Sequence, residues 1–190
     1  MNILNEFELG ILDALQVLRC PFLDGFLSLF AYLFELALLW VTLSVILLCF
    51  PKHRRCGIAI LLAMGVGLLI CNVCLKSLVM RDRPYWVNPD AVVTILTPID
   101  YSFPSGHAVH SMIGASVITS FYPKWGFAVI PIALITGFSR LYFYIHFPTD
   151  VLIGTLIGAA IGFTVAYFCK KWLAQPFYFK RSCLLWKKEK

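Results

Sequence analysis

Charged residues are scarce in this sequence of 190 residues. Lysine and arginine together number 16 and aspartate and glutamate 10, which is 14% of the chain, whereas hydrophobic residues make up 60%. A soluble globule of this size cannot cover its surface with so few charges. The sequence also lacks internal repeats, low-complexity tracts and a glycine-rich nucleotide-binding loop. These absences exclude an ordinary soluble domain and leave a membrane-embedded chain as the expectation.

Long apolar runs recur along most of the chain. A helix needs roughly 20 apolar residues to cross the hydrocarbon core of a bilayer. We expect spans near residues 26–50, 57–80, 107–122, 126–144 and 149–169, of which the third is the shortest. Between residues 3 and 15, apolar residues recur at helical spacing with acidic residues among them, which predicts a helix in the membrane interface rather than a cleavable signal. The expected fold is therefore an all-α, polytopic membrane helical bundle of about five spans plus an N-terminal interfacial helix.

The excess of basic residues predicts the topology. Basic residues follow the first, third and fifth predicted spans and continue into an aromatic-rich tail at 176–190, so they share one side if the spans alternate. The positive-inside rule makes that side cytoplasmic, and this explanation removes the need for a nucleic-acid partner. We expect a single membrane-embedded domain over residues 1–190, with its core at 26–170 and a cytoplasmic basic-aromatic tail, in a bacterial plasma membrane. The oligomeric state stays open.

Most of the remaining basic residues fall in or beside three short clusters. The first runs from Lys76 to Arg83 and Pro84, the second is Pro-Ser-Gly-His at 104–107, and the third runs from Ser139 to Asp150. Alternating spans place all three at the same, extracytoplasmic face. Charges at membrane depth are costly, so their convergence in so apolar a chain indicates a functional site.

The first two clusters carry groups suited to binding phosphate. Lys76 and Arg83 are seven residues apart, which is two helical turns, so they share a face if the helix continues to Pro84, which ends it. Ser105 is expected to cap the helix that follows, and Gly106 allows a ligand to approach the backbone closely. A helix N-terminus also favours an anion, because its N–H groups are free and its dipole is positive there.

The third cluster adds a planar guanidinium and an oriented imidazole. Arg140 offers a fork of donors that matches phosphate oxygens. His146 and Asp150 are four residues apart, the same-face spacing if His146 stands at the head of the fifth span. A carboxylate bonded to one ring nitrogen fixes the tautomer and leaves the other nitrogen free as a nucleophile or base. Taken together, the three clusters favour phosphoryl transfer.

In order and spacing, the clusters resemble the three-part signature of the type 2 phosphatidic acid phosphatase superfamily. The matching residues are Lys76 with Arg83-Pro84, then Pro104-Ser105-Gly106-His107, then Ser139-Arg140 with His146 and Asp150. The resemblance implies a ping-pong hydrolysis in which His146 attacks phosphorus and forms a phosphohistidine. It implies that Asp150 orients His146, and that His107 protonates the leaving oxygen and then activates water. It also implies that no cofactor and no metal is needed, because the phosphate oxygens are held by Lys76, Arg83, Arg140, Ser105 and the amide of Gly106.

Several other charged residues keep more than one interpretation. Arg81 either contacts a second phosphate or a headgroup, or it only lies at the interface. Asp82, Asp90 and Asp100 belong to the same outer segment, which leaves a metal-dependent site open as an alternative. Glu35, inside the first predicted span, is expected to make a structural hydrogen bond or to stay neutral rather than to act in catalysis.

A site at membrane depth favours an amphiphilic phosphate over a soluble sugar phosphate. The resemblance to short bacterial members implies a lipid phosphate or prenyl diphosphate: undecaprenyl diphosphate first, then phosphatidylglycerol phosphate or phosphatidate. A lipid phosphotransferase would use the same phosphohistidine with an acceptor other than water. A non-catalytic binding or carrier protein would use the basic cluster only to hold a phosphate lipid. The expected partners are the lipid phosphate substrate and the bilayer itself.

Overall fold

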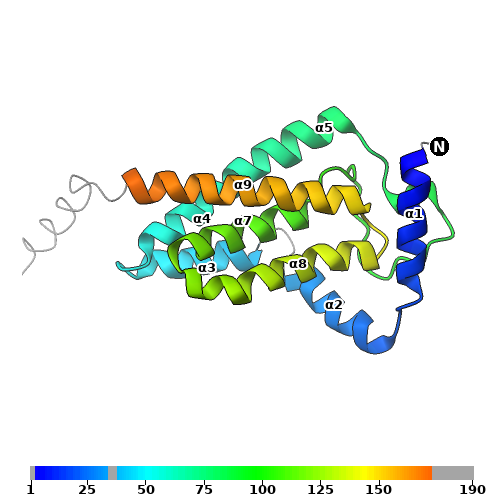
Figure 1. Ribbon diagram of the computed structural model, residues 1–190, viewed down its shortest axis with the longest axis horizontal. Helices are drawn as coiled ribbons and strands as arrows, with labels where there is room; N and C mark the ends of the chain where they lie inside the picture. Colours follow the sequence, from blue (N-terminus) through cyan, green and yellow to red (C-terminus); the bar gives the residue numbers. More distant parts are fainter. Residues whose placement is uncertain (1–2, 34–37, 173–190) are drawn as a thin grey trace, which may run out of the picture.

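Helices make up all the regular structure in residues 3–33 and 38–172, which are the residues described by this computed structural model (Figure 1). The α-helices are α1 Ile3–Gln16, α2 Pro21–Leu33, α3 Leu38–Cys49, α4 Arg54–Gly67, α5 Lys76–Val79, α6 Pro84–Val87, α7 Gly106–Phe121, α8 Gly126–Tyr142 and α9 Pro148–Trp172. A π-helix, η2 Leu68–Leu75, joins α4 to α5, and a 3-10 turn, η3 Pro123–Trp125, precedes α8. The predicted all-α fold is confirmed. Glu35 and the predicted tail at 176–190 lie outside the described residues.

The apolar helices confirm the integral-membrane character but support fewer spans than predicted. Within the described residues, three segments are long and apolar enough to cross a membrane: Arg54–Val87, Pro123–Tyr142 and Pro148–Trp172. A fourth span would combine α2 and α3, which meet at an angle of 51°. The predicted third span is α7, whose 16 residues measure about 24 Å at 1.5 Å per residue, less than the hydrocarbon thickness. This helix packs inside the bundle among α4, α8 and α9.

The contact between α7 and α9 is the most extensive helix–helix contact in the described part of the bundle. Gly154, Gly158 and Gly162 are spaced four residues apart on α9 and face α7. A Cβ atom at Gly158 would lie 2.4 Å from the carbonyl oxygen of Val109, so only glycine allows the two backbones to approach this closely. The same pair of helices is joined at its head, where the Ser105 amide donates to the Asp150 carbonyl at 3.1 Å. The start of α7 is thereby held against the start of α9.

The N-terminal helix α1 stands across one end of the bundle. In Figure 1 it runs roughly at right angles to α7, α8 and α9, beside the end at which α9 begins. Leu9 and Leu12 are buried there against Tyr144 and Phe147, which belong to the turn between α8 and α9. The helix predicted between residues 3 and 15 is confirmed, and its position at a membrane interface stays a prediction.

Two local expectations about helix ends were wrong. The helix that carries Lys76 does not continue to Pro84, because it ends at Val79 and Met80 takes a left-handed conformation with φ of 46°. Pro84 instead occupies the first turn of the short helix α6, where its missing N–H costs nothing. His146 likewise lies two residues before α9 rather than on it. The chemical partners of these residues are therefore brought together by turns and not by a shared helical face.

Candidate active site

The three sequence clusters meet at the end of the bundle where α7 and α9 begin and α8 ends. A guanidinium nitrogen of Arg83, from the first cluster, lies 3.3 Å from Nε2 of His146 in the third. Ser105, from the second cluster, is bonded through its amide to the carbonyl of Asp150. Arg140 joins them through the turn, since its carbonyl accepts the amides of Ile145 and His146 at 3.1 and 3.3 Å. The convergence that alternating spans predicted is therefore present in the structure.

His146 lies at the centre of this site and is only 2% exposed. A guanidinium group can only donate hydrogen bonds, so the contact with Arg83 requires that Nε2 carry a lone pair. In the neutral imidazole the proton then resides on Nδ1. Burial, as the main cause, lowers the pKa of His146 to about 4, with Asp150 acting in the opposite direction and Arg83 in the same one. At neutral pH the ring is therefore uncharged, with its Nε2 lone pair beside Arg83.

The link between His146 and Asp150 runs through a residue that the sequence analysis missed, Ser102. The distance from Nδ1 of His146 to Oδ2 of Asp150 is 3.7 Å, too long for a direct hydrogen bond. The hydroxyl of Ser102 lies 2.5 Å from that carboxylate oxygen and 3.3 Å from Nδ1. Because an ionised carboxylate only accepts, Ser102 donates to Asp150 and accepts from the Nδ1–H of His146. The only signal in the sequence was its position just before the Pro-Ser-Gly-His cluster.

Arg81 lies between two carboxylates. One guanidinium nitrogen donates to Oδ1 of Asp150 at 2.7 Å, and the other forms an ion pair with Glu8 from α1. The guanidinium carbon is also 3.9 Å from the centre of the Phe147 ring, a cation–π contact. These contacts hold Arg81 beside Oδ1 of Asp150, whereas Ser102 contacts the other oxygen, Oδ2. The predicted contact of Arg81 with a headgroup stays a prediction.

Glu8 is the second residue that the sequence analysis missed. It is 2% exposed, and its other carboxylate oxygen accepts the amide of Thr149 at 2.7 Å, so it also caps the first turn of α9. A signal for its burial existed, because Glu8 precedes Leu12 by four residues and therefore lies on the packed face of α1. Through Glu8, the N-terminal helix α1 therefore contacts both Arg81 and the first turn of α9.

The predicted phosphate-binding cations are buried, and two of them are bridged by the half-exposed carboxylate of Asp100. Lys76, Arg83 and Arg140 are 8%, 1% and 2% exposed. Asp100 bridges two of them: one oxygen accepts from Arg83 at 2.5 Å, and the other forms an ion pair with Lys76. Burial raises the pKa of Asp100, but Lys76 and Arg83 lower it by more, so its pKa lies below the ordinary value and the group is ionised at neutral pH.

The second cluster presents polar atoms that the protein itself does not satisfy. The hydroxyl of Ser105 and Nε2 of His107 are both buried, and neither has a hydrogen-bond partner among residues 3–33 and 38–172. Buried polar atoms in proteins are almost always bonded. Gly106 between them is not required by packing, because an added Cβ would meet nothing nearer than Asn72 at 3.7 Å. These features leave the head of α7 able to receive the oxygens of an anion.

A metal centre was the alternative for this site. In the described part of the chain, no group of three or more histidine, cysteine, aspartate or glutamate side chains is placed to hold a metal ion. Asp82, Asp90 and Asp100 therefore do not form such a group. The cationic side chains gathered here suit an anion instead.

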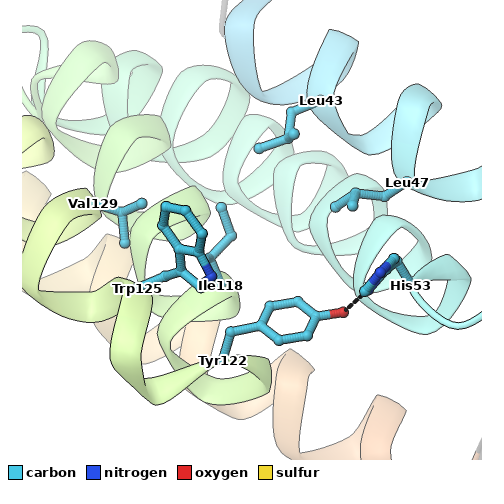
Figure 2. A pocket seen from close by; sticks show the side chains of 7 residues that line it. All are labelled: Leu43, Leu47, His53, Ile118, Tyr122, Trp125 and Val129. Atoms are coloured by element: carbon cyan, nitrogen blue, oxygen red, sulfur yellow. Dashed lines mark hydrogen bonds between the residues drawn. The ribbon is translucent and has the colours of Figure 1, made fainter.

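A separate cavity of about 420 Å³ lies at the opposite end of the bundle, where α4 and α8 begin and α7 ends. Figure 2 shows its lining, including the hydrogen bond of 2.6 Å between His53 and the hydroxyl of Tyr122. The apolar residues that line it are Leu43, Leu47, Ile118, Trp125 and Val129. None of the predicted site residues borders this cavity, so it is distinct from the candidate active site.

Comparison with known proteins places these features in a family. Residues 57–174 match the family model of the PAP2 superfamily. The chain is 33% identical over 126 residues to an undecaprenyl-diphosphatase of Sulfolobus acidocaldarius, covering 65% of this chain and 60% of that protein. It is 36% identical over 121 residues to a decaprenylphosphoryl-5-phosphoribose phosphatase of Mycolicibacterium smegmatis, covering 60% of this chain and 62% of that one. The chain thus spans about three fifths of the length of these two relatives.

Two solved structures share the fold over most of their length. A transmembrane PAP2 type phosphatidylglycerolphosphate phosphatase from Bacillus subtilis aligns with a TM-score of 0.74 and 26% identity, over 93% of this chain and 90% of that one. LpxE of Aquifex aeolicus aligns with a TM-score of 0.68 and 27% identity, over 83% and 93% of the two chains. Both alignments extend well beyond the three clusters.

Proposed function

The chain belongs to the PAP2 superfamily of membrane phosphatases, and from this premise we propose that it hydrolyses a lipid phosphate or prenyl diphosphate through a phosphohistidine intermediate. The observation that carries the proposal is the neutral imidazole of His146, whose Nε2 lone pair lies beside the Arg83 guanidinium. Covalent catalysis of this kind requires a nucleophile that is unprotonated, oriented and close to groups that attract phosphate. His146 combines all three.

In the first step, Nε2 of His146 attacks phosphorus, a nitrogen–phosphorus bond forms, and the bond to the leaving oxygen breaks. The ring becomes positively charged, and the Ser102 hydroxyl and the Asp150 carboxylate stabilise the proton that remains on Nδ1. His107 donates a proton to the leaving oxygen, since an unassisted alkoxide or phosphate is a poorer leaving group. In the second step the oxygen of a water molecule attacks phosphorus, His107 takes a proton from that water, the nitrogen–phosphorus bond breaks with its electron pair returning to Nε2 of His146, and phosphate leaves.

The charge of the transferring phosphoryl group is spread over its equatorial oxygens. We propose that Lys76, Arg83 and Arg140 hold these oxygens, with the hydroxyl of Ser105 and the amide of Gly106 completing the shell. Their burial supports this role, because electrostatic attraction is stronger where water is excluded. Three cations and a helix N-terminus supply the positive charge, so the proposed reaction is independent of metal ions.

The proposed substrate is an amphiphile whose phosphate stands at the membrane surface. The relatives are an undecaprenyl-diphosphatase, a decaprenylphosphoryl-5-phosphoribose phosphatase and a phosphatidylglycerolphosphate phosphatase, and the substrates in these names share a lipid tail and a terminal phosphate. We propose undecaprenyl diphosphate as the first substrate to test, followed by phosphatidylglycerol phosphate and phosphatidate. With the predicted topology, one domain over residues 1–190 would present this site at the extracytoplasmic face.

The test is phosphate release by the detergent-purified chain from a panel of lipid phosphates and diphosphates, in the presence of EDTA. We expect release from at least one of them, and its loss in His146→Ala while the variant still inserts and purifies normally. Retention of full activity by that variant would refute the nucleophile assignment. Transfer of the phosphoryl group to another acceptor would identify a lipid phosphotransferase, and binding without turnover would identify a carrier.

A further inference from the structure

The carboxylate of Asp100 is an anion of the protein itself, and it contacts two of the cations that are proposed to hold phosphate. Its two carboxylate oxygens are divided between Arg83, at 2.5 Å, and Lys76. A phosphate group bound by the same two side chains would offer two of its oxygens in the same way. The carboxylate and the phosphate therefore compete for one position, because both are anions and both need the same donors.

The geometry allows the carboxylate to leave without moving the backbone. The carbonyl of Asp100 is held by Nε of Arg83 at 2.6 Å, and two residues later the amide of Ser102 donates to the carbonyl of Arg81 at 2.8 Å. The side chain, by contrast, is 48% exposed and is bonded only through its oxygens. Rotation about its own bonds would carry the carboxylate into solvent while the backbone that supports Ser102 stays in place.

We propose that Asp100 is a specificity-determining residue that excludes phosphodiesters from the site by competing with them for Lys76 and Arg83. The inference rests on the proposed function. A phosphodiester headgroup carries one negative charge and has no advantage over a carboxylate already in place. A phosphomonoester or the terminal phosphate of a diphosphate carries about 1.5 to 2 charges at pH 7 and displaces it, because attraction to the cations grows with charge.

This competition matters because of where the site lies. Ordinary membrane phospholipids are phosphodiesters and surround the protein at high local concentration, so a bare cluster of buried cations would be occupied by them. A resident carboxylate reduces the apparent affinity for every anion, because that affinity is the intrinsic one multiplied by the fraction of time during which the carboxylate leaves the site free. Only ligands that overcome this cost reach Lys76 and Arg83.

The experiment compares the wild-type chain with Asp100→Asn and Asp90→Asn in mixed micelles. Asn keeps the shape of Asp100 and removes its charge, and Asp90→Asn makes the same change of net charge at an exposed position of the same segment. The probes are orthovanadate as a competitive inhibitor and phosphatidylglycerol as a phosphodiester. We expect the inhibition constant for orthovanadate to fall about tenfold in Asp100→Asn only. Phosphatidylglycerol should inhibit this variant at mole fractions that leave the other two proteins unaffected.

The outcomes separate this inference from the function on which it rests. An unchanged or raised inhibition constant in Asp100→Asn, with an active wild type, would overturn the inference alone, since Asp100 would then only hold Lys76 and Arg83 in place. Absence of both turnover and orthovanadate binding in all three proteins would overturn the proposed function, and the inference with it.

Discussion

Replacing Ser102 with alanine removes the hydroxyl that connects His146 to Asp150. In the structure the direct distance between the two side chains is 3.7 Å, whereas the Ser102 oxygen lies 3.3 Å from His146 and 2.5 Å from Asp150. The serine is fully buried, so no solvent molecule replaces its oxygen without a rearrangement. We expect the imidazole to lose its fixed orientation and part of the stabilisation of its charge in the transition state.

The size of the loss follows from the type of bond removed. A hydrogen bond to a charged group contributes about 1.5 to 3 kcal/mol, and each 1.36 kcal/mol of lost transition-state stabilisation lowers the rate tenfold. The expected decrease in kcat is therefore about 10- to 150-fold. It should be smaller than the loss in His146→Ala, because Asp150 keeps its bonds to the Phe147 amide and to Arg81. The Michaelis constant should change little, since the hydroxyl of Ser102 contacts His146 and Asp150, which are not among the proposed phosphate ligands.

The assay measures kcat and KM for phosphate release, with Ser116→Ala as the matched control. Ser116 is also a buried serine, and its hydroxyl has no hydrogen-bond partner in the described part of the chain. The control should keep full activity. A kcat for Ser102→Ala within twofold of the wild type would refute the proposed link between His146 and Asp150. A large rise in KM with unchanged kcat would show that the serine acts in binding instead.

Three further predictions concern the support of the site, its protonation and the packing beneath it. Glu8→Gln should lower kcat about tenfold without changing KM, because the neutral glutamine side chain binds the Arg81 guanidinium more weakly than the carboxylate does. Steady-state kinetics of the purified variant would measure both constants. The rate should fall as the pH drops through about 4, where His146 becomes protonated and its Nε2 loses the lone pair. A fall in rate near pH 6.5 instead would contradict the inference that burial lowers the pKa of His146. Gly158→Ala should destabilise the protein by about 1 to 3 kcal/mol, because its Cβ meets a backbone oxygen at 2.4 Å. Gly65→Ala, with nothing within 4 Å, should not lower the thermal unfolding midpoint in detergent.

Much of the candidate site could be predicted because its residues stand out against an apolar chain. Charged and hydrogen-bonding residues are costly beside hydrocarbon, so those that remain at the ends of predicted spans mark a site with little ambiguity. Lys76, Arg83, Arg140 and His146 were identified in this way, and the structure brings all four to one end of the bundle. The order of apolar runs also predicted which helix ends meet there.

The supporting residues could not be predicted in this way. Ser102 lies in a segment with no helical period, and serine carries too little signal by itself. Glu8 reaches Arg81 across 73 positions of sequence, and Asp100 reaches Lys76 across 24 positions, past the left-handed residue Met80 that follows the end of α5. Contacts between segments so far apart depend on how turns direct the chain, and turns have no repeating pattern that a single sequence displays.

The sequence by itself determined that this is a helical membrane protein, and it named the residues that are proposed to carry its chemistry, because hydrophobicity and helical spacing are local properties of the chain. Only the tertiary structure decided how those residues are connected: Ser102 stands between His146 and Asp150, α1 contacts Arg81 through Glu8, and Asp100 pairs with Lys76 and Arg83. These links are made across the packed bundle, where the position of each side chain depends on every helix around it rather than on its neighbours in sequence.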